Sequence, residues 1–326
     1  MTFVSSSSGD RSPPRRQRTP VERDLERLRR ARPRARRRRS RRGLLWTGVA
    51  LVAVIAIVVA LARGHGSKPV PTIAQPPVVR VLITEGKTRA QIAPLVLADG
   101  LQGDYLAATR RSPLLDPAAY GAPADTPDLE GFLFPATYDM FKGTPVSRLV
   151  EEQLVAFKEN FGPVEIARAR ALHVTPYQLL IVASMVEREA VSPGDRPKIA
   201  AVIYNRLAQG MPLGIDASIY YAVEQADHIP TYTGELTEAQ LHIDSPYNTR
   251  THVGLPPTPI SNPGVASIQA AADPAHVGYL YYVAGADGCG EQVFSDTLAE
   301  FETDAAAYHE AVRRAGGRPP ACRRKQ

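Results

Sequence analysis

The longest uninterrupted apolar stretch of the 326-residue chain lies near its start, at residues 43–62. Its sequence, GLLWTGVALVAVIAIVVALA, contains no charged residue. As an α-helix it would extend about 30 Å, the thickness of the hydrocarbon core of a bilayer. A buried core helix of this length normally carries a polar stripe, and a cleaved signal peptide has a shorter apolar core and less sequence before it. The pattern therefore predicts a single transmembrane helix.

A second pattern, strand-like residues followed by helical spacing, begins at Val78. The run VVRVLI is rich in β-branched residues, and Glu85-Gly86 predicts a turn. Thr88 is a suitable N-cap for the helix that RAQIAPLVLADG predicts. With the turn-rich segment that follows, we expect residues 78–126 to form a strand–helix unit of LysM-like size and a connector.

The clearest helix signal begins at Val174 and reaches about Ala190. Thr175 is a good N-cap, and Pro176 suits the first helical position. Gln178 completes a capping box with Thr175. Pro193 lies shortly beyond the expected end of the helix, where a proline is common.

Two glutamates near the end of this helix are candidates for acid–base chemistry. At about 100° per residue, Glu189 falls on the apolar face between Met185 and Val182, whereas Glu187 lies nearer the polar edge. A carboxyl group beside apolar residues is desolvated, which raises its pKa and suits a general acid. From periodicity alone, a salt-bridged residue at a helix end explains Glu189 better than a general acid does.

The charge of the chain is divided unevenly along its length. The formal net charge is +6, yet residues 1–42 hold sixteen arginines against four acidic residues, so the rest of the chain sums to −6. A basic pI therefore does not indicate a nucleic-acid-binding main body. The segment 1–42 is rich in Ser, Pro and Arg, and we expect a disordered tail.

The same arginine excess predicts the orientation in the membrane. Because positive charge favours the cytoplasmic side, residues 1–42 are expected in the cytoplasm and the chain after residue 63 outside it. Residues 63–77, RGHGSKPVPTIAQPP, have the composition of a semi-extended linker. The predicted location is the cell membrane, with a single-pass anchor and an extracytoplasmic main domain.

Cysteines and histidines limit the chemistry further. Cys289 and Cys322 are the only two cysteines, and in an exported region we expect them to form a disulfide. The seven histidines show no close ligand spacing, and there is no CxxC or HExxH motif. A GxSxG motif and a phosphate-binding glycine loop are also absent. We expect no metal and no cofactor.

Four ordered segments resemble the endolytic murein transglycosylase family, also called MltG-type or YceG-like. They are LEGFLFPATYDM at 129–140, ASMVEREA at 183–190, IAAVIYNRLAQGMPLGIDASIYYA at 199–222 and SPYNTRTHVGLPPTPISNPGVASIQAAADPAHVGYLYYVA at 245–284. The resemblance covers about residues 78–312, and the N-terminal anchor is also typical of the family. Gly214, Ile215 and Ala217 depart from the family pattern around Asp216.

The resemblance implies an α+β ectodomain behind a single N-terminal transmembrane helix. It consists of the small LysM-like strand–helix unit with its connector, a mixed α/β catalytic domain at 127–315 and a C-terminal tail at 316–326. The implied activity is lytic cleavage of nascent glycan strands at internal MurNAc-β-1,4-GlcNAc bonds, which leaves 1,6-anhydro-MurNAc ends and terminates strand elongation. One carboxyl group serves as acid and then as base.

The resemblance also implies site residues. The family's catalytic glutamate aligns with Glu189, and Glu187 is the second candidate. Polar residues of the matched segments are expected to line a saccharide groove: Asn205, Arg206, Asp216, Tyr247, Asn248, Thr249 and, in the loop 255–264, Asn262. Core packing explains Tyr204 and Tyr247 equally well, and a structural turn explains the loop.

The implied partners are nascent peptidoglycan strands, the lipid bilayer, and penicillin-binding proteins or glycan polymerases, with no specific nucleic acid. One alternative is a catalytically silent, glycan-binding scaffold of the cell-wall machinery. A second, an aminodeoxychorismate lyase, is a cytosolic enzyme and conflicts with the predicted topology. A third, nucleic-acid binding by the arginine-rich tail, is compatible with catalysis.

Overall fold

The computed structural model describes residues 53–61 and 77–322, which belong to two separate units. Residues 53–61 are helical. No helix within the described residues has both the length and the apolar character needed to cross a bilayer. The predicted transmembrane helix at 43–62 lies only partly within these residues, and the basic tail and most of the linker lie outside them. The membrane anchor therefore stays a prediction.

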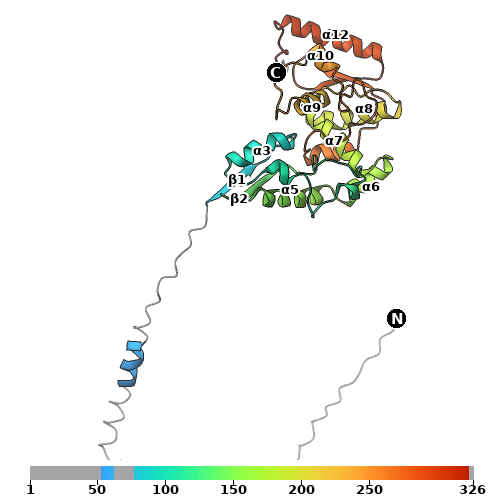
Figure 1. Cartoon of the computed structure of the whole chain (residues 1–326). Coiled ribbons are helices and arrows are strands. Elements are labelled where there is room, and N and C mark those ends of the chain that lie inside the picture. Colours follow the sequence, from blue (N-terminus) through green and yellow to red (C-terminus); the bar gives the residue numbers. More distant parts are fainter. Residues whose placement is uncertain (1–52, 62–76, 323–326) are drawn as a thin grey trace, which may run out of the picture. The chain divides into compact units, whose positions relative to one another are not determined.

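The second unit consists of short helices and two separate antiparallel strand pairs (Figure 1). Its elements in chain order are β1 (Val78–Leu82), α3 (Arg89–Ala98), α4 (Tyr105–Ala108), η1 (Pro117–Tyr120), β2 (Thr137–Phe141), α5 (Val146–Asn160), α6 (Pro163–Ala171), α7 (Pro176–Glu189), η2 (Pro193–Asp195), α8 (Arg196–Ala208), α9 (Asp216–Ala226), α10 (Glu238–Leu241), α11 (Val265–Ala272), β3 (Tyr281–Ala284), β4 (Gln292–Ser295) and α12 (Leu298–Arg314). The mixed α/β class expected from the sequence is confirmed.

The strand–helix unit at the start of this fold extends further than the sequence predicts. Strand β1 pairs antiparallel with β2, with Val78 opposite Phe141 and Leu82 opposite Thr137. The strand pair thus crosses the predicted boundary at residue 126, which lies between β1 and its only strand partner in the described chain. The sequence did not indicate this pairing, because strand pairing is set by contacts distant in sequence.

Helix α7 forms the centre of the core. Its residues from Tyr177 to Val186 are all buried except Gln178, so the helix is enclosed on every side and not only along one apolar stripe. It packs against α6, α8, α9 and α11, and Figure 1 shows it between α5 and α6 on one side and α8 and α9 on the other. This burial fixes the position of the helix end that carries both candidate glutamates.

A buried polar network joins the strand–helix unit to the loop before α11. The Asn262 side chain accepts hydrogen bonds from the backbone N–H groups of Gly131 (2.9 Å) and Leu133 (3.0 Å). Its amide donates to the Lys87 carbonyl at 2.9 Å and to the Glu130 carboxyl at 2.7 Å. Asn262 is 0 % exposed. The side-chain oxygen and amide of Asn262, a residue predicted to bind saccharide, are therefore both engaged within the protein.

The Glu130 carboxyl of this network predicts a pH-dependent stability. Burial raises its pKa from 4.5 to about 8, and the nearby Asp128 carboxylate adds to the rise. The folded chain therefore holds a proton that the unfolded chain loses above pH 4.5, so the free energy of unfolding falls as the pH rises from 4.5 to about 8. The slope from this one group is at most ~1.4 kcal/mol per pH unit.

In Glu130→Gln this contribution to the slope should be missing. Urea unfolding of both proteins between pH 5 and 8 measures the difference, and the exposed Glu238→Gln is the matched control that keeps the wild-type slope. Equal slopes in wild type and Glu130→Gln would contradict the assignment.

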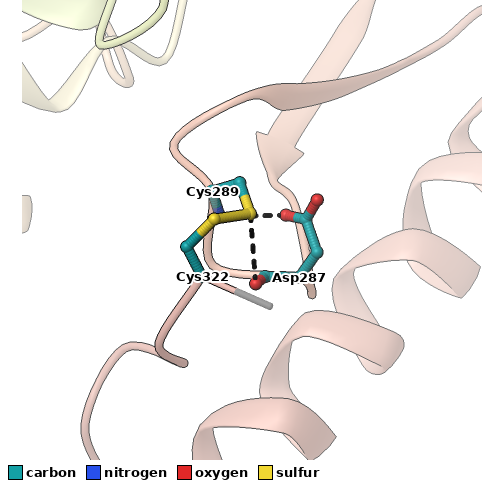
Figure 2. The surroundings of a disulfide bond; sticks show 3 residues. All are labelled: Asp287, Cys289 and Cys322. Atoms are coloured by element: carbon teal, nitrogen blue, oxygen red, sulfur yellow. Dashed lines mark hydrogen bonds between the residues drawn. A yellow bond between two sulfur atoms is a disulfide. The ribbon is translucent and has the colours of Figure 1, made fainter. Parts of the chain in front are cut away.

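The C-terminal part of the fold consists of β3, β4 and α12, and it carries the disulfide. Tyr281 of β3 stacks on Phe301 of α12 with 5.4 Å between the ring centroids. Figure 2 shows Cys289, in the turn between the strands, bonded to Cys322 beyond the end of α12. The backbone N–H of Cys289 also donates to the Asp287 side chain at 3.0 Å. The disulfide thus ties the last described residues to the β3–β4 turn.

Replacing both cysteines by serine should lower the stability of this part of the fold. The bond closes a loop with a sequence separation of 33 residues, for which the chain-entropy argument gives about 3–4 kcal/mol. Limited proteolysis followed by mass spectrometry should show faster cleavage within the closed loop in Cys289→Ser/Cys322→Ser, as in the reduced wild type. Equal cleavage rates in the oxidised wild type and the double variant would contradict this expectation.

Candidate active site

The candidate site is built around Glu189, the last residue of α7. The helix begins with the predicted capping box, in which the Gln178 N–H donates to Thr175 Oγ1 and the Thr175 N–H donates to the Gln178 side chain. It ends at Glu189 because Ala190 has an extended backbone conformation. The buried helix body therefore delivers this carboxyl group to a fixed position at the edge of the core.

Three other elements converge on Glu189. The backbone N–H of Ala217, in the first turn of α9, donates to Oε1 at 3.3 Å. The hydroxyl group of Tyr282, on β3, donates to Oε2 at 3.1 Å. The Gln292 side chain, on β4, donates to the Glu189 backbone carbonyl at 3.2 Å. Both carboxyl oxygens and the backbone of the residue are thus held from outside its own helix.

The surroundings of Glu189 favour its protonated form. Burial raises the pKa of this carboxyl group. The neighbouring Asp216 carboxylate raises it further, while the donors on Ala217 and Tyr282 and the Arg188 guanidinium oppose the rise. A carboxylic acid that keeps its proton above its ordinary pKa is suited to protonate a leaving oxygen.

Glu187, the second candidate from the sequence, has structural contacts. Its Oε2 accepts a hydrogen bond from the Gly264 N–H, at the start of α11, with a length of 2.9 Å. Its Oε1 lies 3.8 Å from Nη2 of Arg196, and the Glu187 side chain is 7 % exposed. A carboxylate at a helix N-terminus stabilises that terminus. The geometry therefore favours Glu189 over Glu187 as the acid.

Asp216 and Arg250 supply the charged surface next to Glu189. Asp216 is the first residue of α9, directly before the Ala217 N–H that contacts Glu189. Its Oδ1 accepts from Arg250 Nη2 at 2.6 Å and Nε at 3.0 Å. The two side chains are 51 % and 44 % exposed. Among the residues predicted to bind saccharide, Asp216 is the one whose side chain is open to solvent beside the acid.

The side chains of Asn205 and Arg206 bind the backbone segment that leads into β3. The Asn205 amide donates to the carbonyls of Val277 and Tyr279, both at 2.9 Å. Arg206 donates to the Leu280 carbonyl, and its guanidinium lies over the Tyr281 ring, 5.0 Å from the centroid. Both side chains thus fix the segment that enters β3. The structure thus gives these two residues, which were predicted to bind saccharide, a supporting role through bonds to backbone carbonyls.

Thr249 and Asn248 also face the interior, with exposures of 1 % and 0 %. Thr249 Oγ1 accepts from the backbone N–H of Ile215, the residue before α9, at 2.9 Å. The Asn248 amide donates to the carbonyls of Leu241 and Ile243. Thr249 thus supports the start of α9, and Asn248 supports the end of α10 and the residues that follow it.

The tyrosines that the sequence left open between packing and binding are both engaged within the fold. The Tyr247 hydroxyl group lies 2.9 Å from Thr258 Oγ1, and its ring meets Tyr221 edge-on. The Tyr204 hydroxyl group donates to the Ala271 carbonyl at 3.0 Å. The loop before α11 is also held within the fold, because the Ile260 N–H donates a hydrogen bond to the Ser184 side chain of α7.

Sequence reasoning did not single out Tyr282, Gln292 or the Ala217 N–H. Each of these groups approaches Glu189 from a segment distant in sequence. Strand alternation predicts that Tyr281 and Tyr282 lie on opposite faces of their strand. The sequence does not show which of the two faces packs against α7. Within the described part of the chain, no group of three or more His, Cys, Asp or Glu side chains could hold a metal ion.

Comparison with known proteins gives a consistent result. The YceG-like family matches residues 54–307. An endolytic murein transglycosylase of Bacillus subtilis is 39% identical over 174 residues, which are 53% of this chain and 46% of that protein. The protein of the same name from Streptococcus pneumoniae D39 is 36% identical over 156 residues, or 48% of this chain and 28% of that protein. The chain thus matches less than half the length of these curated relatives.

A solved structure shows the same fold. The crystal structure of a yceG-like protein from Listeria monocytogenes aligns with a TM-score of 0.59 and 32% sequence identity. The alignment covers 70% of this chain and 76% of the Listeria chain. The described arrangement of helices and strand pairs is therefore shared with a protein of known structure.

Proposed function

The chain belongs to the YceG-like family, and from this membership and the geometry around Glu189 we propose that it is a murein transglycosylase that cuts peptidoglycan glycan strands. The observation that carries the proposal is the environment of Glu189. Its carboxyl group is held at both oxygens, by Ala217 and Tyr282, and burial raises its pKa. The names of the relatives from Bacillus and Streptococcus support the same reaction class.

The proposed reaction is lytic and uses Glu189 twice. Protonated Glu189 gives its proton to the oxygen of an internal MurNAc-β-1,4-GlcNAc bond, and the bond from that oxygen to muramyl C1 breaks. The Glu189 carboxylate then takes the proton of the muramyl 6-hydroxyl group. As it does so, the oxygen of that hydroxyl group forms a bond to C1. The products are a strand that ends in 1,6-anhydro-MurNAc and a strand with a free GlcNAc 4-hydroxyl group, and Glu189 is protonated again. No water is consumed.

The charged surface beside Glu189 fits this role. The Asp216 carboxylate disfavours a second negative charge on Glu189, which keeps the acid protonated before the first step. Arg250, exposed and paired with Asp216, would offer a cationic group to the carboxylates of muramyl peptides on a strand bound at Glu189. Asn205, Arg206 and Thr249 set the positions of β3 and α9, and through them the two donors on Glu189.

The proposed location follows from the sequence. The apolar segment 43–62 would anchor the chain in the cell membrane, with the arginine-rich tail in the cytoplasm and the catalytic domain outside. There the enzyme would meet nascent strands next to the penicillin-binding proteins or glycan polymerases that make them, and cleavage would terminate strand growth.

Chromatography of strand lengths tests the function. The full-length chain in detergent, incubated with uncrosslinked peptidoglycan strands, should produce fragments of intermediate length from the start of the reaction, because the cuts are internal. Disaccharides released from the ends as the first product would contradict the endolytic assignment. Strands that bind to the folded protein but stay intact would favour the catalytically silent scaffold.

A further inference from the structure

Tyr282 holds one of the two carboxyl oxygens of Glu189. Its hydroxyl group donates to Oε2 over 3.1 Å. Burial and the adjacent Glu189 charge both raise the pKa of Tyr282 above its ordinary value, so the phenol keeps its proton at neutral pH and can serve as a donor. The contact therefore does not depend on the ionisation of the tyrosine.

The position of the Tyr282 ring is set before any substrate binds. Strand β3 pairs with β4, with Tyr282 opposite Phe294 in the register. Arg206 fixes the carbonyl of Leu280 at the start of the strand, and Gln292 joins β4 to the backbone of Glu189. The hydroxyl group and the carboxyl group are thus parts of one connected frame.

The two donors leave the proton of Glu189 available to the substrate. The Ala217 N–H and the Tyr282 hydroxyl group can donate to the carboxyl oxygens in both protonation states, because a carboxylic acid keeps a lone pair on each oxygen. In the acid state the proton of Glu189 is therefore free for the glycosidic oxygen, while Oε2 keeps its hydrogen-bond partner.

We propose that Tyr282 is a positioning residue for Glu189, which holds the carboxyl group in one orientation through both the acid step and the base step. The proposal rests on the proposed function, since it assigns Tyr282 a part in that reaction. Tyr282 itself exchanges no proton with the substrate. Its effect passes through Glu189 alone.

The other charged groups around this pair are few and stay in place when the hydroxyl group is removed. Asp216 of α9 and Arg188 of α7 act on Glu189. Arg206 of α8 and Asp216 act on Tyr282. Replacing Tyr282 by phenylalanine changes none of these residues, so a change in the pKa of Glu189 in that variant reports the hydroxyl group.

The direct test is a titration of Glu189 in Tyr282→Phe. Carbon-13 NMR of the full-length chain labelled at the glutamate carboxyl carbon follows the pKa, and Glu189→Gln assigns the resonance. Loss of a donor to the carboxylate should raise the pKa of Glu189 by about one unit. Tyr281→Phe is the matched control: its ring lies against Phe301, and the pKa should stay at the wild-type value.

The pH profile of strand cleavage supplies the second readout. For Tyr282→Phe the alkaline limb of kcat/KM should move to higher pH by the same amount, and kcat at the optimum should fall about tenfold with KM little changed. An unchanged titration of Glu189 together with an unchanged profile would overturn the proposal. If the wild type cleaves no glycan, the proposed function fails, while the titration alone still decides whether Tyr282 controls Glu189.

Discussion

Glu189→Gln should reduce strand cleavage by at least about 10³-fold, because the substitution removes both the acid and the base from a reaction that has a single catalytic carboxyl group. Glutamine has the same shape: its Oε1 can accept from the Ala217 N–H and its Nε2 can donate to the Tyr282 hydroxyl group, so the fold should persist. Initial rates of strand shortening, together with the unfolding midpoint of each protein, measure the two effects separately.

Glu187→Gln is the matched control for this prediction. The two glutamates lie two residues apart on α7, yet Glu187 contacts Gly264 and Arg196 and not the site. Its replacement should leave the rate per folded molecule within about threefold and lower the free energy of unfolding by about 2 kcal/mol, because Arg196 loses its charged partner. An active Glu189→Gln with an inactive Glu187→Gln would reverse the assignment.

Gly131→Ala should produce a large loss of stability. Gly131 has a φ of +87°, and an added Cβ would lie 2.5 Å from Cγ and 2.6 Å from Cβ of Pro259. A proline ring cannot rotate away, so the strained backbone and the overlap together should cost about 3 kcal/mol or more. The N–H of Gly131 also donates to Asn262, so the shift would disturb the buried polar network. Chemical unfolding measures the loss.

Gly210→Ala separates the two causes. Gly210 also has a positive φ, +65°, but no atom lies within 4 Å of the added Cβ. It should cost only about 1 kcal/mol, from the backbone conformation alone. Equal losses in the two variants would contradict the close approach of the Gly131 and Pro259 segments.

Local features of the sequence predicted the local structure well. Thr175, Pro176 and Gln178 predicted the start of α7, and Thr88 predicted the start of α3, because a capping box is formed by residues three positions apart. These signals need no knowledge of the tertiary fold. The apolar spacing was less informative: it put Glu187 near a polar edge, whereas α7 is enclosed on every side and the Glu187 side chain is only 7 % exposed.

The roles of the polar residues could not be predicted in the same way. In the sequence, an asparagine that binds a carbonyl is identical to one that binds a sugar. Asn205 donates to backbone more than 70 positions away, and Asn262 to Lys87 175 positions away. Motif positions such as these identify the family, and only the packing shows which of them support the site and which, like Asp216, face the solvent.

Mass spectrometry of the new muramic acid ends, with the reaction run in water enriched in oxygen-18, tests the central claim most directly. If Glu189 transfers the proton of the muramyl 6-hydroxyl group, the new ends are 1,6-anhydro-MurNAc, one water lighter than reducing ends, and contain no oxygen from the solvent. Reducing ends that carry oxygen-18 would show that water attacks C1, and the lytic role proposed for Glu189 would be wrong.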